Sequence, residues 1–342
     1  MRIGLLTGGG DCPGLNAAIR AVVRVAQDSG DQVLGFRHGW RGVVEGESTP
    51  LTTQQTKGIL QSGGTILRTA RYHPYEHEGA TEAVRATFER ERLDCFVVLG
   101  GDGTLGAAAL LTETGVRIVG IPKTIDNDVL GTERCIGFAT AVATAAEAVD
   151  RVHTTGESHD RLMVVEVMGR STGWLAVFSG IAAGADAICI PEQTTSLDSL
   201  SAAFRSRHEA GSTSSVVVVA EGAAIAGAED DAGGTKGAIV ARGLERRTGF
   251  EVRLTILGHV QRGGEPTALD RLLATAFGVA AIDAVHDGCT ATLLAAIGEE
   301  TVRVPLGKVR PGRRPVPPSM LALAKRMSVP REVPQALGCR AP

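Results

Sequence analysis

Hydrophobic and polar positions along this 342-residue chain form short apolar runs that alternate with longer stretches of helical spacing. Apolar runs that end at glycine or polar residues predict buried strands. We therefore expect strands at 3–7, 95–99, 116–121, 163–167, 187–190, 216–220 and 301–305. Apolar residues three and four positions apart predict helices at 15–26, 139–152 and 320–327.

The alternation of strands and helices predicts an α/β fold with mainly parallel sheets covered by helices on both faces. The chain is long enough for two domains, and we expect a boundary near Gly137 because the helix at 139–152 is long enough to connect two sheets. Residues 223–237 are rich in alanine, glycine and aspartate, which predicts a mobile surface loop. Prolines and arginines dominate 311–318, a composition that resembles a tether.

Composition narrows the class of protein. Hydrophobic residues make up 43% and charged residues 21%, as in globular proteins, and the net charge of -3 leaves no basic surface for nucleic acid. No stretch approaches the roughly 18 apolar residues of a membrane span. The six cysteines are scattered without a C-x-x-C pair, which indicates a reduced, cytoplasmic protein.

Two polar loops follow predicted strands and carry the chemistry. The run 100–104 (Gly-Gly-Asp-Gly-Thr) follows one strand, and 122–128 (Pro-Lys-Thr-Ile-Asp-Asn-Asp) follows the next. Parallel strands would bring Asp102, Asp126 and Asp128 to the carboxyl edge of one sheet, where open α/β sheets bind ligands. These carboxylates beside glycines suit a phosphate donor, a divalent cation and a hydroxyl that needs a base. Helix capping by Asp102 and Asx turns at the other two are the structural alternatives.

Two further glycine loops favour phosphate binding. Residues 8–11 (Gly-Gly-Gly-Asp) lie between a strand and a helix, where backbone N–H groups can face an anion, although a plain tight turn has the same pattern. Residues 258–264 add His259 and Arg262, three apart, which can converge on one phosphate. Arg71, Arg161 and Arg170 adjoin strand or loop ends, and each alone could equally be a surface charge.

Taken together, these segments resemble the 6-phosphofructokinase family. The matching stretches occur in family order at 7–20, 63–71, 100–104, 122–128, 166–170, 220–222 and 257–264, with Asp270 and Arg271 just beyond. NAD kinases and diacylglycerol-type lipid kinases share only the Gly-Gly-Asp-Gly-Thr run, so the other segments exclude them.

The resemblance implies two similar Rossmann-like domains with three layers each and with catalysis between them. The ATP- and Mg²⁺-binding domain would comprise 1–137 and about 264–305. The fructose 6-phosphate domain would comprise 138–263 and about 306–342, which includes the C-terminal tail. The resemblance also implies a glycolytic kinase that forms a homodimer or homotetramer, with an active site shared between subunits.

The resemblance assigns roles to individual residues. Asp126 would be the general base on the fructose 1-hydroxyl, and Thr124 would hold the transferring phosphoryl group. Asp102 and Asp128 would serve Mg²⁺. Gly10, Arg71 and Arg170 would stabilise the negative charge of the phosphoryl group. ATP would contact Gly10, Arg71, Tyr72, Gly101, Asp102, Gly103 and Thr104. Fructose 6-phosphate would contact Thr124, Asp126, Asp128, Met168, Gly169, Arg170, Glu221, His259 and Arg262, with Arg161 and Arg253 reaching it from a neighbouring subunit.

Two positions bear on the donor. Gly103 is typical of family members that use ATP, and Lys123 is typical of relatives that use pyrophosphate. The pair resembles an actinobacterial-type branch in which ATP use is known. The sequence therefore predicts an ATP-dependent enzyme that makes fructose 1,6-bisphosphate. The alternatives are a pyrophosphate-dependent enzyme and a catalytically silent sugar-phosphate sensor, which would need no base.

A separate regulatory expectation also follows from the resemblance. Arg20 and Arg24 match basic residues of the family's bacterial effector site. His153 stands where that site has an arginine, and 206–215 lacks the lysines expected there. We therefore expect a weak response to ADP and phosphoenolpyruvate.

Overall fold

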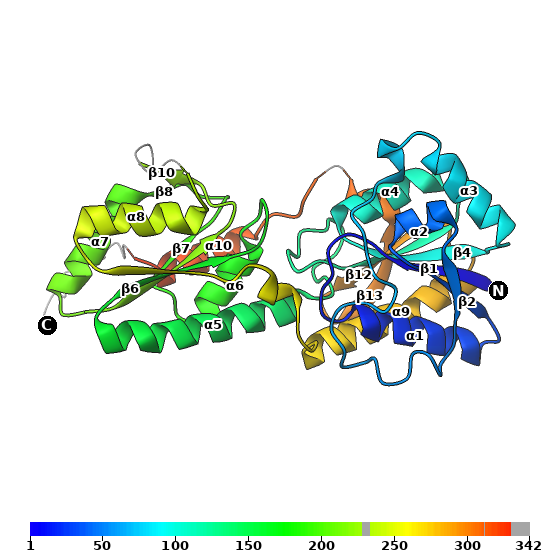
Figure 1. Ribbon diagram of the computed structural model, residues 1–342, viewed down its shortest axis with the longest axis horizontal. Coiled ribbons are helices and arrows are strands. Elements are labelled where there is room, and N and C mark those ends of the chain that lie inside the picture. The colour runs from blue at the N-terminus through cyan, green and yellow to red at the C-terminus, as the bar shows by residue number, and fades with distance from the viewer. Residues whose placement is uncertain (228–232, 311, 330–342) are drawn as a thin grey trace, which may run out of the picture. The chain divides into compact units, whose positions relative to one another are not determined.

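The computed structural model describes residues 1–227, 233–310 and 312–329, which form two compact units (Figure 1). Unit 1 comprises Met1–Ala141 and His259–Arg314, and unit 2 comprises Val142–Gly258 and the chain from Pro315 onward. The limits expected from the sequence were 137, 263 and about 305, whereas the units change after 141, 258 and 314. Each unit is built on a mainly parallel sheet, so the predicted α/β class is confirmed.

Unit 1 contains a seven-stranded sheet in the order β13-β12-β5-β4-β1-β2-β3. Only the two outer pairs, β12 with β13 and β2 with β3, are antiparallel. All residues of β4 and β5 are buried, as expected for inner strands covered on both faces. The strands are β1 (Arg2–Thr7), β2 (Gln32–Phe36), β3 (Ser48–Leu51), β4 (Cys95–Gly100), β5 (Ile118–Pro122), β12 (Ala291–Ile297) and β13 (Glu300–Pro305).

The helices of unit 1 cover its sheet on two faces (Figure 1). They are α1 (Leu15–Asp28), α2 (Trp40–Glu45), α3 (Ala80–Arg90), α4 (Asp102–Thr112) and α9 (Ala268–His286), with 3-10 turns η1 (Pro74–Glu76), η3 (Gly258–Arg262) and η4 (Leu306–Val309). Helices α1 and α9 pack side by side, and a Cβ on Gly278 would lie 2.5 Å from the Cβ of Ala21. Glycine is therefore needed for that close approach. On the core side of β4, Phe96 lies edge-on to Phe36 and Trp40.

Unit 2 contains a four-stranded parallel sheet in the order β11-β6-β9-β7 and a two-stranded sheet, β10-β8. The strands are β6 (Leu162–Val167), β7 (Ala187–Cys189), β8 (Thr195–Ser196), β9 (Ser215–Ala220), β10 (Ile225–Ala226) and β11 (Val252–Ile256). The helices are α5 (Phe138–His159), α6 (Trp174–Ala182), α7 (Leu197–Glu209), α8 (Lys236–Thr248) and α10 (Pro318–Met327). Figure 1 shows α7 and α8 on one face of the four-stranded sheet and α5 on the other.

Most predicted elements are confirmed within one or two residues, and two predictions need correction. The long helix α5 continues to His159, seven residues beyond its expected end at 152. The expected loop at 223–237 contains β10 and, in its last two residues, the start of α8. Positions 228–232 of that loop, and Pro311 of the expected tether, lie outside the described residues.

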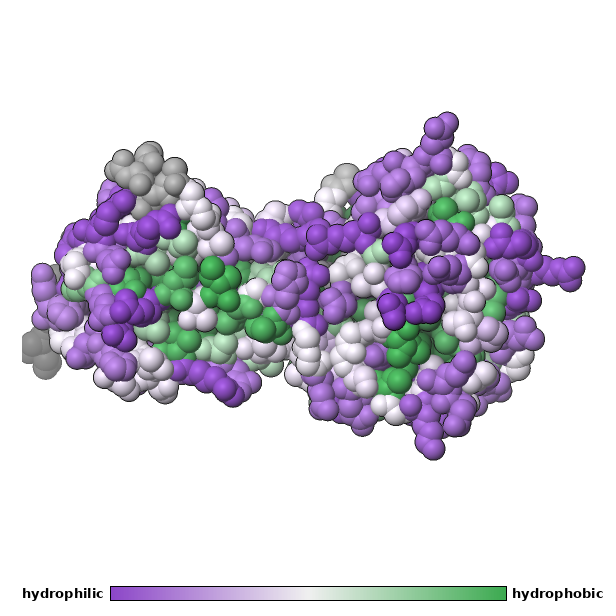
Figure 2. Space-filling view, viewed as in Figure 1, coloured by the Kyte–Doolittle hydropathy of each residue, from purple (hydrophilic) through white to green (hydrophobic). Residues whose placement is uncertain are grey.

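On the face shown in Figure 2, apolar residues gather in patches within a mainly hydrophilic surface. Leu269 and Leu272, near the start of α9, expose 65% and 69% of their surface. Within the described residues, no helix is long and apolar enough to cross a membrane.

The five cysteines of the described part of the chain are free thiols.

Candidate active site

The turn from β4 into α4 places Asp102 at the first position of that helix. Thr104, two residues further on, is buried against two glycines. A Cβ on Gly8 would lie 2.6 Å from the Thr104 Cγ2 atom, and a Cβ on Gly100 would also collide with this side chain. The loop after β1 can therefore approach the N-terminus of α4 closely. Backbone N–H groups at a helix N-terminus favour anions, so this part of unit 1 suits a phosphate chain.

Lys123 is buried beneath the glycine loop 8–11. Its side chain is 2% exposed, and its Nζ donates hydrogen bonds to the carbonyl oxygens of Gly8 (2.8 Å) and Gly10 (2.6 Å). Burial lowers the pKa of the ammonium group from its usual value. The charge of Lys123 is thus used to hold the loop, and the N–H groups of Gly8 and Gly9 donate to the carbonyl oxygens of Leu99 (2.9 Å) and Ala70 (3.1 Å).

Gly10 and Arg262, which the sequence assigned to different substrates, are in contact. A Cβ on Gly10 would overlap the guanidinium of Arg262, so only glycine leaves room for that arginine. Arg262 ends the η3 turn, and His259 in the same turn is exposed. The structure therefore brings the loop after β1 and the η3 turn together within unit 1.

The loop after β5 is fixed by its own side chains. Asn127 has a left-handed φ of 51°, its Oδ1 accepts from the Cys135 N–H at 2.9 Å, and its Nδ2 donates to the Glu133 carbonyl at 3.2 Å. The Asp126 N–H donates to the Thr124 Oγ1 at 3.1 Å. Asp126 and Asp128 on either side of Asn127 are both buried. These contacts hold the expected base and the expected metal ligand in one rigid loop.

The carboxylates of Asp102 and Asp128 meet at the same arginine. Arg313 Nε lies 3.1 Å from Asp102 Oδ2 and 3.2 Å from Asp128 Oδ2, and Arg313 Nη2 lies 3.1 Å from the same Asp102 oxygen. Burial, followed by the charges of Asp126 and Asp102, raises the pKa of Asp128 to about 7, while Arg313 lowers it. The structure thus confirms that loops after β4 and β5 converge, and it places a cation between them.

This donor set suits magnesium better than zinc. No group of three or more His, Cys, Asp or Glu side chains with a metal-binding arrangement occurs in the described part of the chain. Structural zinc sites need four protein ligands, whereas Mg²⁺ is usually held by one or two carboxylates together with water and substrate phosphates. The Asp102–Asp128 pair, with a cation already across it, fits the second pattern.

The side chain of His73 fills the space beside Gly103. A Cβ at this position would lie 2.6 Å from His73 Cε1, so the imidazole of His73 packs over the glycine. Tyr72, the preceding residue, stacks on His77 with ring centroids 4.2 Å apart and packs against the core. Arg71 is exposed. A side chain at Gly103 would therefore have to displace His73 before it reached a bound donor.

In unit 2, the turn after β6 holds the expected sugar-phosphate residues. Gly169 and Arg170 have positive φ angles of 137° and 52°, and a Cβ on Gly169 would lie 2.7 Å from the Thr172 carbonyl oxygen. The Glu221 Oε1 accepts from the Arg170 N–H at 2.7 Å. Met168 precedes this turn, so the structure brings Met168, Gly169, Arg170 and Glu221 to the carboxyl ends of β6 and β9.

Arg161 and Arg253, the two arginines expected to serve a neighbouring subunit, converge on one carboxylate. Arg161 Nη2 lies 2.8 Å from Glu251 Oε1, and Arg253 pairs with the same oxygen. The hydrogen bond from Arg161, followed by the charges of both arginines, lowers the pKa of Glu251. The strands β6 and β11 are adjacent, which accounts for this pairing.

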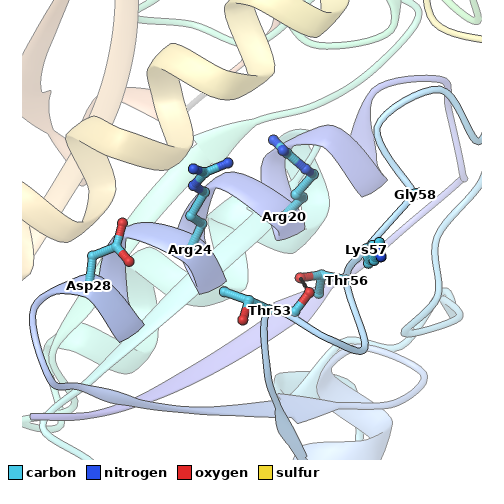
Figure 3. Close-up of a pocket in the computed structure, with 7 residues that line it drawn as sticks. All are labelled: Arg20, Arg24, Asp28, Thr53, Thr56, Lys57 and Gly58. Atoms are coloured by element: carbon cyan, nitrogen blue, oxygen red, sulfur yellow. Dashed lines mark hydrogen bonds between the residues drawn. The ribbon is translucent and has the colours of Figure 1, made fainter.

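A separate pocket of about 380 Å³ lies in unit 1 between α1 and the loop after β3. Arg20, Arg24 and Asp28 project from successive turns of α1 (Figure 3). Lys57 on the facing loop adds another cation. The two arginines that match the family's effector site therefore do line a cavity, with an aspartate and a lysine beside them.

Sequence reasoning missed Arg313 as a residue of the site and assigned no role to His73. Arg313 belongs to the segment that was expected to be a tether, and the Arg313-Arg314 pair after Gly312 was the only signal there. His73 follows Arg71 and Tyr72 directly, so its position near the donor residues could have been proposed from the sequence. Its contact with Gly103 depends on the path of the loop and could not have been proposed from the sequence.

Comparisons with known proteins agree with this geometry. A family model described as phosphofructokinase matches residues 2–285. A pyrophosphate–fructose 6-phosphate 1-phosphotransferase from Amycolatopsis methanolica is 47% identical over 332 residues, which cover 93% of this chain and 97% of the relative. The ATP-dependent 6-phosphofructokinase 3 of Streptomyces coelicolor is also 47% identical, over 338 residues that cover 95% of this chain and 99% of the relative.

A solved structure is similar over almost the whole chain. The crystal structure of Pichia pastoris phosphofructokinase in the T-state superposes with a TM-score of 0.83 at 35% identity. The match covers 95% of this chain and 36% of the yeast chain, which is much longer.

Proposed function

This chain belongs to the phosphofructokinase family, and from that premise we propose that it transfers the γ-phosphoryl group of ATP to the 1-hydroxyl of fructose 6-phosphate. The products are ADP and fructose 1,6-bisphosphate. The observation that carries the proposal is the pair of loops after β4 and β5, which place the buried Asp126 beside Asp128 and Asp102. A sugar-phosphate sensor needs no buried carboxylate in such a loop.

The chemistry assigned to the protein is direct in-line transfer without a covalent intermediate. Asp126 accepts the proton of the attacking hydroxyl, and Thr124 holds the phosphoryl group as it moves. The N-terminus of α4 and Gly10 of the glycine loop supply backbone N–H groups to the donor phosphates. Arg71 and Arg170 neutralise the charge that develops on the phosphoryl oxygens.

Asp102 and Asp128 would hold Mg²⁺. The fit rests on two carboxylates that already share one cation and on the absence of a larger ligand cluster among the described residues. Bound Mg²⁺ would neutralise donor phosphate charge and favour departure of ADP.

Pyrophosphate is the second candidate donor, and two observations favour considering it. Relatives with either donor in their names are 47% identical to this chain, so identity alone does not choose between them. Lys123 is the residue typical of pyrophosphate users, but its ammonium is held by Gly8 and Gly10. Gly103, typical of ATP users, therefore decides the proposal in favour of ATP.

Fructose 6-phosphate is assigned, as the family resemblance implies, to Met168, Gly169, Arg170, Glu221, His259 and Arg262. We propose a homo-oligomer in which Arg161 and Arg253 serve a neighbouring subunit. Support comes from the convergence of these two arginines and from the exposed leucines near the start of α9. The free thiols support a cytoplasmic location, where cysteines stay reduced.

Phosphorus NMR tests the assigned reaction. The full chain is incubated with fructose 6-phosphate, ATP and Mg²⁺, and the products are followed without coupling enzymes. We expect a second sugar-phosphate resonance from the 1-position to grow in step with ADP. Tight binding of fructose 6-phosphate with no new resonance would instead establish a sensor.

A further inference from the structure

The segment that follows η4 lies against the carboxylates of the candidate active site. Arg313 contacts Asp102 Oδ2 through both Nε and Nη2 and contacts Asp128 Oδ2 through Nε. Both contacts are made to carboxylate oxygens of the two residues that would hold a divalent cation. A guanidinium and a metal ion cannot share these positions.

The charges explain why an arginine lies here. Asp102, Asp126 and Asp128 carry like charges that act on one another, and Asp128 is almost fully buried. Like charges this close repel one another, and a cation placed between them offsets the repulsion. Arg313 supplies one positive charge, whereas a divalent ion would supply two and would coordinate the oxygens directly.

The arginine side chain can leave without loss of the segment. The neighbouring Arg314 donates its backbone N–H to the Asp128 carbonyl at 2.8 Å, and its Nη1 donates to the carbonyls of Asn127 (3.3 Å) and Glu133 (2.6 Å). The side chain of Arg313 is 36% exposed and that of Asp102 is 28% exposed, so solvent reaches this end of the contact. Rotation of one flexible side chain would open the carboxylates while Arg314 keeps the backbone in place.

We propose that Arg313 is a positioning residue that holds Asp102 and Asp128 in the metal-free protein and that a divalent cation binds by displacing its guanidinium. This inference rests on the proposed metal site. It predicts that Arg313 raises the metal concentration needed to fill the site, because each binding event must break the arginine contacts.

The test measures metal binding without turnover. Mn²⁺ binding to the full chain, in the absence of sugar and nucleotide, is followed at pH 8 by electron paramagnetic resonance of the free ion. Arg313→Ala should tighten Mn²⁺ binding about tenfold, because it removes a competing charge-assisted contact that is partly exposed. Arg313→Lys, which keeps a cation but loses the planar fork, should lie between the two. Arg310→Ala, an exposed arginine in the same segment, is the matched control and should bind Mn²⁺ as the wild type does.

A second variant shows where the ion lies. Adding Asp102→Asn to Arg313→Ala should abolish the gain in affinity, and circular dichroism with a thermal melt checks that both variants fold. Unchanged or weaker Mn²⁺ binding in Arg313→Ala would overturn the proposal, since the arginine would then be irrelevant or would help the metal. Equally tight binding in the double variant would overturn it as well. Either result could occur in an enzyme that phosphorylates fructose 6-phosphate normally, so failure of this inference is distinguishable from failure of the proposed function.

Discussion

Replacement of Lys123 by methionine removes an ammonium group and keeps the length of the side chain. In the wild type this group donates to the carbonyl oxygens of Gly8 and Gly10 at 2.8 and 2.6 Å, and the side chain is 2% exposed. Methionine fills similar volume but donates nothing, so both carbonyls lose a buried, charged donor. We expect the glycine loop to lose its anchor while the sheet beneath it remains folded.

Opposing contributions set the size of the effect. A hydrogen bond to a charged group contributes about 1.5–3 kcal/mol, and two of them are lost. Burial of the ammonium, which lowers the pKa of Lys123, is itself unfavourable, and that cost disappears in the variant. Because the removed burial cost offsets part of the two lost bonds, we expect the free energy of unfolding to fall by about 2 kcal/mol, close to the contribution of a single such bond.

Two measurements check this reasoning. Urea denaturation of Lys123→Met gives the stability change, with Lys308→Met, an exposed lysine of unit 1, as the control. Initial rates with ATP and with pyrophosphate should fall together, so that their ratio stays within about threefold of the wild-type value. Unchanged stability together with a tenfold or larger shift of that ratio would refute the argument, because Lys123 would then act on the donor rather than on the loop.

The remaining predictions concern three carboxylate or glycine positions. Asp126→Ser should lower kcat by about 10²–10⁴-fold and leave KM for fructose 6-phosphate nearly unchanged, and a loss below tenfold would exclude Asp126 as the base. Gly103→Asp should sharply reduce kcat/KM for ATP because the new side chain meets His73 and donor phosphates. If adding His73→Ala restores activity, bulk rather than charge is responsible. Burial raises the pKa of Asp270 although the N–H of Gly137 and the N–H and hydroxyl of Thr140 bond to it, so the folded protein binds this proton more tightly than the unfolded chain. The stability of the wild type relative to Asp270→Asn should therefore rise as pH falls from 7 toward 4 in urea titrations, and a rise in the opposite direction would contradict the assignment.

Strands β1, β4, β5, β6, β7, β9 and β13 could be predicted because their apolar runs are short and bounded by glycine or polar residues. The sequence analysis did not predict β2, β3, β8, β11 and β12. The loops after β4 and β5 were located for the same reason, and their convergence follows from parallel pairing of adjacent strands. The extent of α5 was underestimated because its last seven residues are polar or glycine and have no apolar period. The short β10 was missed because two residues carry no pattern.

Contacts between distant segments were beyond the reach of sequence patterns. The hydrogen bonds of Lys123 to Gly8 and Gly10 span more than a hundred positions, and the contact of Arg313 with Asp102 spans 211. The family resemblance assigned Lys123 to the donor and left Arg313 without a role. Both assignments depend on where a side chain ends in space, which the order of strands does not determine.

The central claim is that the protein uses ATP rather than pyrophosphate to phosphorylate fructose 6-phosphate. The most direct test compares initial rates of the wild type with each donor at saturating fructose 6-phosphate and Mg²⁺, with the bisphosphate product detected through aldolase. The account predicts steady turnover with ATP and hardly any with pyrophosphate. Equal or faster turnover with pyrophosphate would contradict it and would show that Gly103 does not decide the donor.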